Sequence, residues 1–190
     1  MKLDKKTNYI VSGLERSGTS MLMQILYEGE IEISFDNARK PDKNNPRGYF
    51  ELNRGKIINL IINGDFKFDN YKAKFIKITA YGLKFLPPGN YKIIYCERNI
   101  EEVLDSMEKM IGEKDKSRGD TKKSFISLNN MIKKEINNRK DTKILYINYN
   151  EILLNPKKNI KKILKFLNIP YINLDKMIKV VDNNLYRQRK

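Results

Sequence analysis

The sequence predicts an α/β fold in three layers, with a parallel sheet covered by helices on both faces. Three observations indicate this fold class. Short apolar runs rich in isoleucine and tyrosine alternate with longer segments of helical periodicity. The short runs are apolar on both of their faces, as expected for strands that are buried on both sides. A glycine-containing loop joins the first run to the first helical segment, which is typical of P-loop folds that bind nucleotides.

Four segments have the composition of strands. They are Asn8 to Ser12, Lys74 to Thr79, Tyr91 to Glu97 and Lys143 to Asn148. Ligands of parallel α/β sheets bind where the strands end. We therefore expect the functional site in the loops that follow these four segments.

Helices are predicted between and after the strands. The segments with apolar residues at helical spacing are Ser20 to Tyr27, a stretch between Phe50 and Gly64, Ile100 to Ile111, Lys122 to Asn138, and a last helix from Asn155 onward. We interpret Asn155 and Pro156 as the N-cap and first-turn proline of that last helix. Ser34 to Gly48 and Gly112 to Lys123 are predicted as coil. Because no repeat or low-complexity linker divides the chain, we expect one domain over residues 1–190.

Composition and charge exclude several classes of protein. The apolar runs are too short for a membrane span or a signal-peptide core, so we expect a cytoplasmic protein without a membrane partner. Cys96 is the only cysteine and histidine is absent, which excludes an internal disulfide and a histidine base and argues against a metal site. The 38 Lys and Arg residues exceed the 23 Asp and Glu residues, for a formal net charge of +15. Most of these cations are lysines, which favours biased residue usage over nucleic-acid recognition.

The strongest functional signal is the loop from Gly13 to Ser20. Its glycines have the spacing of the P-loop G-x-x-x-x-G-K-[ST], but Thr19 stands where the lysine would be. Backbone N–H groups and the positive end of the following helix favour anion binding. Without the lysine that reaches the β- and γ-phosphates, transfer of a γ-phosphate is disfavoured. Arg16 supplies a cation at a different place in the loop.

Four segments resemble the sulfotransferases that use 3′-phosphoadenosine 5′-phosphosulfate. Arg16-Ser17-Gly18-Thr19-Ser20 matches the family's [RK]-S-G-T-[TS] loop. Arg98-Asn99, with Ser106 eight residues after the arginine, is similar to the family's second signature. Residues 46–51 and 149–170 resemble further stretches of bacterial members. The segments occur in the expected order and cover most of the chain.

The resemblance implies roles for individual residues. The residues implied to bind the phosphosulfate cofactor are Gly13, Arg16, Ser17, Gly18, Thr19 and Ser20, with Arg98 and Ser106 on its 3′-phosphate. Arg16 would also stabilise charge on the leaving phosphate. Lys77 resembles a lysine that bacterial members place near the transferring group. By spacing alone, Lys77 fits a solvated strand-end lysine and Ser106 a small packing residue equally well. The spacing of Asn99 and Glu102 predicts a capping box.

The acceptor must lose a proton, and carboxylates are the available bases in a chain without histidine. Glu51 is our first choice, with Asp36 and Asp42 as alternatives. Glu51 fits an acid at a helix start equally well. The family's C-terminal basic element has no clear match, although Arg187 and Arg189 lie in the tail.

These observations predict a sulfotransferase that moves a sulfuryl group from 3′-phosphoadenosine 5′-phosphosulfate to an acceptor hydroxyl or amine without a metal ion. The alternatives are a P-loop nucleotide kinase and a non-catalytic module that binds anions or nucleic acid. The sequence identifies neither the acceptor nor the oligomeric state.

Overall fold

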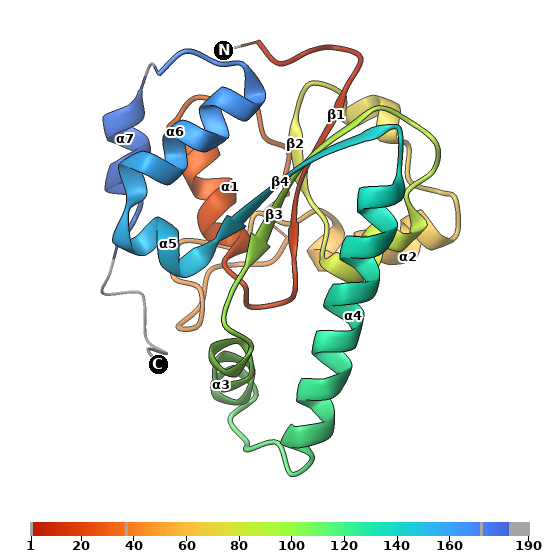
Figure 1. Cartoon of the computed structure of the whole chain (residues 1–190), viewed down its shortest axis with the longest axis vertical. Coiled ribbons are helices and arrows are strands. Elements are labelled where there is room, and N and C mark those ends of the chain that lie inside the picture. The colour runs from red at the N-terminus through yellow and green to blue at the C-terminus, as the bar shows by residue number, and fades with distance from the viewer. Residues whose placement is uncertain (1, 37, 172, 183–190) are drawn as a thin grey trace.

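The computed structural model describes residues 2–36, 38–171 and 173–182 (Figure 1). Its centre is a four-stranded sheet in which all neighbouring strands are parallel. The strands are β1 (Asn8–Gly13), β2 (Phe75–Lys77), β3 (Tyr91–Glu97) and β4 (Thr142–Asn148), in the order β2-β1-β3-β4. This sheet confirms the predicted α/β fold class.

Helices of very different lengths connect and follow these strands. They are α1 (Thr19–Glu28), α2 (Ile57–Ile62), α3 (Ile100–Ile111), α4 (Arg118–Asn138), α5 (Tyr149–Leu154), α6 (Pro156–Leu167) and α7 (Leu174–Lys179). Three 3-10 turns accompany them, namely η1 (Asn53–Gly55), η2 (Phe68–Tyr71) and η3 (Ala80–Phe85). The turn η1 lies in the segment that leads to α2, and η3 directly follows the end of β2.

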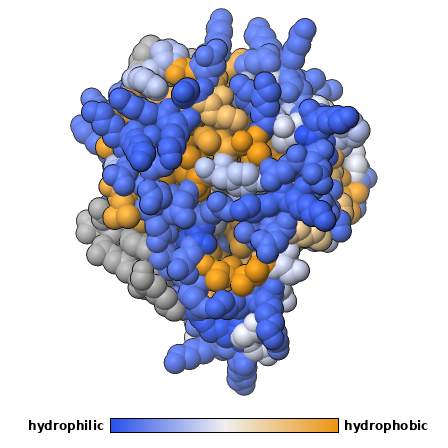
Figure 2. All heavy atoms as spheres, viewed as in Figure 1, coloured by the Kyte–Doolittle hydropathy of each residue, from blue (hydrophilic) through white to orange (hydrophobic). Residues whose placement is uncertain are grey.

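Two apolar clusters form the core, one on each face of the sheet. Val11 and Ile94 point into the cluster that α1, α5, α6 and α7 complete, and Ile10 and Ile93 point into the one under α2, η3 and α4. This alternation follows from the two-residue period of a strand. Figure 1 shows these helix groups on opposite sides of the sheet, which gives the three predicted layers. Hydrophilic side chains cover most of the face drawn in Figure 2, with apolar side chains between them.

The strand ends that build the site lie at one edge of the sheet. Gly13, the last residue of β1, is in register with Cys96 of β3, and Glu97 is in register with Asn148 of β4. The loops after these three strands therefore begin side by side. Within the described residues, none of the helices has the length and apolar character needed to cross a membrane.

The structure differs from the predicted elements where tertiary contacts decide the outcome. Helix α4 begins at Arg118 instead of Lys122, because the Arg118 guanidinium pairs with three α3 carboxylates at 2.7 Å each. Part of the predicted coil from 112 to 123 is therefore helical. Asn155 precedes α6 as predicted, but its side chain makes no capping hydrogen bond, while Pro156 does occupy the first turn. The short helices α5 and α7 were not predicted.

Replacement of Ile94 by alanine should destabilise the protein strongly. The Ile94 side chain is completely buried, so its truncation leaves a cavity in the core and should cost about 2–5 kcal/mol of unfolding free energy. Ile111, which is 65% exposed, is the matched control, and its alanine variant should stay within about 0.5 kcal/mol of the parent. Urea denaturation followed by circular dichroism measures both. Equal effects in the two variants would contradict this description of the core.

Candidate active site

The loop between β1 and α1 depends on two glycines. Gly13 and Gly18 have φ angles of +150° and +107°, which side chains disfavour. A Cβ atom on Gly13 would lie 2.4 Å from the Cys96 carbonyl oxygen, and one on Gly18 would lie 2.3 Å from the Tyr149 ring. The loop therefore packs so closely against the end of β3 and the start of α5 that larger residues do not fit.

This loop has the properties of an anion site. Helix α1 begins at Thr19, has no acidic residue in its first turn and receives no side-chain cap, so its positive end is not compensated locally. Ser17 is 1% exposed, and its hydroxyl has no hydrogen-bond partner within the described structure. A buried hydroxyl without a partner is energetically unfavourable. The Ser17 oxygen lies against Gly13, only 2.5 Å from where a Cβ atom would be, so it faces the inside of the loop, and the anion site consists of the residues from Gly18 onward.

The thiol of Cys96, at the end of β3, packs against the glycine loop. Its Sγ atom lies 3.1 Å from the Ser17 carbonyl oxygen, to which it donates a weak hydrogen bond. Burial raises the pKa of Cys96 to about 12. The thiol therefore supports the loop and is not a nucleophile at neutral pH.

Arg98 holds the loop from the end of β3. Its Nε atom pairs at 2.9 Å with Glu102, a carboxylate with no exposed surface, and its Nη1 atom donates to the Arg16 carbonyl oxygen at 3.0 Å. The Arg98 guanidinium carbon also lies 4.5 Å from the centre of the Tyr149 ring. The predicted capping box is wrong in one respect. Asn99 caps α3 by accepting a hydrogen bond from the Glu101 N–H, but the Glu102 carboxylate pairs with Arg98 and accepts a hydrogen bond from the Asn150 amide.

The structure brings Arg16 and Ser106 together. Arg16 Nε donates to the Ser106 hydroxyl at 2.9 Å, and Nη2 donates to the Asn44 carbonyl oxygen at 3.3 Å. The Ser106 hydroxyl therefore faces the site and does more than allow close helix packing. Burial lowers the pKa of Arg16 from its ordinary value, and the nearby charge of Arg98 adds to this decrease. The guanidinium remains positively charged, because arginine keeps its proton in proteins.

Lys77 is a buried cation at the end of β2. It is 6% exposed, which excludes the alternative of a solvated lysine. Its Nζ atom lies 3.0 Å from Glu51 Oε1 and 3.2 Å from Ser20 Oγ, and it donates to the Tyr49 carbonyl oxygen. Burial lowers the pKa of Lys77, and the negative charge of Glu51 opposes this decrease.

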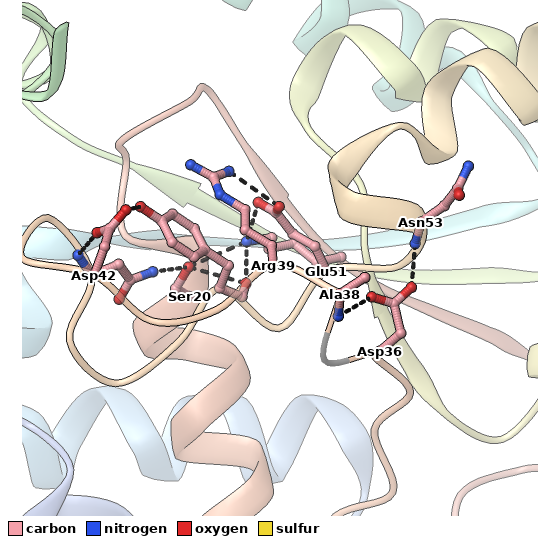
Figure 3. A network of polar contacts seen from close by, with 10 residues as sticks. Ser20, Asp36, Ala38, Arg39, Asp42, Glu51 and Asn53 are labelled. Carbon is pink, nitrogen blue, oxygen red and sulfur yellow. Dashed lines mark hydrogen bonds and ion pairs between the residues drawn. The ribbon is translucent and has the colours of Figure 1, made fainter.

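Glu51 is the carboxylate that the structure places at Lys77. Its second oxygen accepts a hydrogen bond from Arg39 at 3.2 Å, as Figure 3 shows. Helix α2 begins only at Ile57 and has no acidic residue in its first turn, so the interpretation of Glu51 as a helix-start acid is wrong.

The two alternative bases, Asp36 and Asp42, accept hydrogen bonds within the coil and do not contact Lys77 (Figure 3). Asp36 accepts hydrogen bonds from the backbone N–H groups of Ala38 and Asn53. Asp42 accepts a hydrogen bond from the Tyr49 hydroxyl at 2.8 Å and two more from backbone N–H groups. Neither lines the cavity described below, whereas Glu51 does. Glu51 is therefore the best placed of the three predicted bases.

One cavity of about 340 Å³ connects these groups. Of the predicted site residues, it is lined by Arg16, Gly18, Thr19, Ser20, Glu51, Lys77, Arg98 and Ser106. Gly13 and Ser17 shape the loop behind this wall. Arg187 and Arg189 lie outside the described residues. Among the residues that are described, no group of histidine, cysteine and acidic side chains has the arrangement of a metal site.

Among the residues of this site that sequence reasoning missed are Arg39, Tyr49 and Tyr149. Arg39 pairs with Glu51, and the Tyr49 carbonyl oxygen accepts a hydrogen bond from Lys77. Arg39, Tyr49 and Tyr149 all line the cavity. Tyr149 directly follows β4, where a ligand-binding loop was expected. Arg39 and Tyr49 lie in coil, where no periodic pattern predicts the position of a side chain. The path of this coil depends on contacts with residues far away in the sequence.

Comparisons with known proteins agree with the geometry. Residues 6–189 match the family model described as a sulfotransferase domain. The structure of mouse sulfotransferase SULT7A1 complexed with PAP is similar over 98% of this chain and 67% of that chain, with a TM-score of 0.54 and 17% identity. The sulfotransferase domain of the Synechococcus PCC 7002 olefin synthase is similar over 97% of this chain and 83% of that chain, with a TM-score of 0.50 and 12% identity. No curated protein sequence matches the chain. At these identities, the two structures establish the fold.

Replacement of Lys77 by methionine should change how stability depends on pH. Because burial lowers the pKa of Lys77, the unfolded chain binds more protons at this site as pH approaches the ordinary lysine value of 10.5. The contribution of Lys77 to the free energy of unfolding therefore increases as pH rises from the lowered pKa of the folded state toward 10.5. Urea unfolding across a pH series should show the parent gaining stability relative to Lys77→Met as pH rises. Lys114→Met, at an exposed position, should retain the parent's slope. Parallel curves for the parent and Lys77→Met would contradict the buried position of the ammonium group.

Proposed function

This chain belongs to the sulfotransferase domain family, whose activity is sulfuryl transfer, and on that premise we propose that its cavity binds 3′-phosphoadenosine 5′-phosphosulfate and an acceptor hydroxyl or amine. One observation carries the proposal. A glycine loop that suits an anion but lacks the lysine of nucleoside triphosphatases lines the same cavity as Arg98, Ser106 and the Glu51–Lys77 pair.

The residues present fit the proposed donor. Gly18, Thr19 and Ser20 line the cavity, and the start of α1 carries uncompensated positive charge. The backbone N–H groups of residues 18–20 would hold the 5′-phosphosulfate, and Arg98 with Ser106 would hold the 3′-phosphate. The mouse relative was crystallised with PAP, which supports this choice of nucleotide.

The donor supplies an activated sulfuryl group attached to its 5′-phosphate. During transfer the bond between sulfur and the phosphate oxygen breaks, a bond from sulfur to the acceptor oxygen or nitrogen forms, and the acceptor proton must go to a base. Arg16, Lys77 and the loop N–H groups would stabilise the negative charge that develops on the phosphate. Glu51 would accept the proton. We propose that no metal takes part, because these cations already supply positive charge at the reacting atoms.

The nucleotide preference tests the proposal directly. Isothermal titration calorimetry should show tight binding of 3′-phosphoadenosine 5′-phosphate and weak binding of ATP with magnesium, because the loop lacks the lysine that grips a γ-phosphate. Arg16→Ala should weaken binding of 3′-phosphoadenosine 5′-phosphate, whereas Lys114→Gln, which removes an exposed charge outside the cavity, should not. The reverse preference would overturn the proposal in favour of a P-loop kinase.

Glu51→Gln tests the assignment of the base. The amide preserves the shape of the side chain but cannot accept the acceptor proton, so kcat should fall by about 10²- to 10⁴-fold with unchanged affinity for 3′-phosphoadenosine 5′-phosphate. The acidic limb of the pH–rate profile should flatten. Glu15→Gln is the matched control, since Glu15 lines the same cavity without contacting Lys77. A Glu51→Gln variant with the parent's rate at every pH would return the role to Asp36 or Asp42. If Glu51→Gln instead loses binding of 3′-phosphoadenosine 5′-phosphate, Glu51 maintains the shape of the nucleotide-binding loop and is not the base.

A further inference from the structure

Three consecutive residues beside Glu51 have left-handed backbone conformations. The φ angles are 52° at Asn53, 55° at Arg54 and 81° at Gly55. Such conformations normally occur at single positions, and they are unfavourable for a long side chain such as that of arginine. Three hydrogen bonds maintain the turn. The Asn53 N–H donates to Asp36, the Gly55 N–H donates to the Leu52 carbonyl oxygen at 3.0 Å, and the Lys56 N–H donates to the Asn53 carbonyl oxygen at 2.9 Å. Unfavourable backbone that is held in this way often accompanies a functional site.

The turn places Arg54 at the Glu51 end of the cavity. Gly55 lies so close to Glu51 that a Cβ atom there would be 2.9 Å from Oε2, and the adjacent Arg54 lines the cavity wall. Ile58 and Thr79 line the same cavity. The turn therefore brings Arg54, an exposed residue, to the rim of the cavity near the proposed base.

Arg54 differs from the other arginines of this wall in its contacts. Arg39 pairs with Glu51 and lies with its guanidinium carbon 3.4 Å from the centre of the Tyr49 ring, and Arg47 pairs with Asp182 at 3.0 Å. Within the described part of the chain, Arg54 makes no side-chain hydrogen bond or ion pair. Its charge is available to a ligand.

The charges at this end do not balance. Three cations, Arg39, Arg54 and Lys77, lie near one carboxylate, that of Glu51. The donor's phosphates do not require Arg54, because the proposed function assigns them to the glycine loop, Arg98 and Ser106. An excess of positive charge in a cleft attracts anions, and the planar fork of arginine matches an oxyanion.

We propose that the acceptor carries an anionic oxygen group, such as a carboxylate, sulfate or phosphate, which Arg54 binds while the acceptor hydroxyl or amine faces Glu51. This inference rests on the proposed function and names its substrate class. Arg54 is then a specificity-determining residue. It does not take part in the transfer itself.

A matched set of phenols tests the inference. The probes are para-hydroxyphenylacetate, tyrosol and tyramine, which present the same phenol with a negative, neutral or positive group at similar distance. Sulfuryl transfer from labelled donor should have a kcat/KM at least about tenfold higher for the anion than for tyrosol, as expected for a charge-assisted hydrogen bond. Calorimetry on protein saturated with 3′-phosphoadenosine 5′-phosphate should show the same order of affinities.

Arg54→Gln should remove this preference, so that the ratio of kcat/KM for para-hydroxyphenylacetate to kcat/KM for tyrosol falls to about one. Arg54→Asn provides a second variant, because asparagine tolerates left-handed backbone. Lys56→Gln is the matched control, since it removes the same charge two residues away at an exposed position outside the cavity lining. It should retain the preference.

The inference is overturned if the parent does not prefer the anionic phenol, if the preference survives in both Arg54 variants, or if the nucleotide-loaded protein does not bind the anion. Failure of the proposed function has a different signature. The parent would then neither bind 3′-phosphoadenosine 5′-phosphate nor transfer label, while Arg54-dependent binding of the anionic phenol to the free protein would still support the anion site.

Discussion

The ion pair between Arg98 and Glu102 joins the parts of the structure that form the cavity. Glu102 is fully buried in α3, and separation of a buried pair leaves an uncompensated charge, which costs about 3–5 kcal/mol. With its orientation set by Glu102, Arg98 reaches the Arg16 carbonyl oxygen and lies against the Tyr149 ring. That ring in turn occupies the space that Gly18 leaves open. One pair thus links β3, α3, the glycine loop and the start of α5.

The two sides of the cavity are built in different ways. The proposed donor side consists of strand ends and helix starts, whose positions follow from the register of the sheet. The proposed acceptor side comes mainly from coil between α1 and α2, which individual contacts attach to the scaffold. Asn45 donates to Ser20, and Arg47 pairs with Asp182. The two sides should therefore differ in how readily they accept substitutions, because coil tolerates change better than a sheet edge does.

The same division explains what sequence reasoning predicted. Strand positions, the glycine loop and the Arg98–Ser106 spacing are local patterns, and the structure brings Arg16, the loop residues from Gly18 to Ser20, Arg98 and Ser106 to one cavity. The start of α4 was missed because Arg118 is fixed by carboxylates of α3. Glu102 was assigned to a capping box because sequence spacing cannot distinguish a backbone partner from the adjacent Arg98. Arg39 and Arg54 carried no signal, since their positions depend on coil and on left-handed backbone that no periodicity describes.

The position of Cys96 has a practical consequence for spectroscopy. It is the only thiol of the chain, it is buried beneath the glycine loop, and at neutral pH it is protonated. Maleimide reagents require an accessible thiolate, so the folded protein should be inert to them. A cysteine introduced on the surface would then be the single labelling position without removal of the natural one. Fluorophores or spin labels placed on the coil between α1 and α2 would report its movements against an unmodified scaffold.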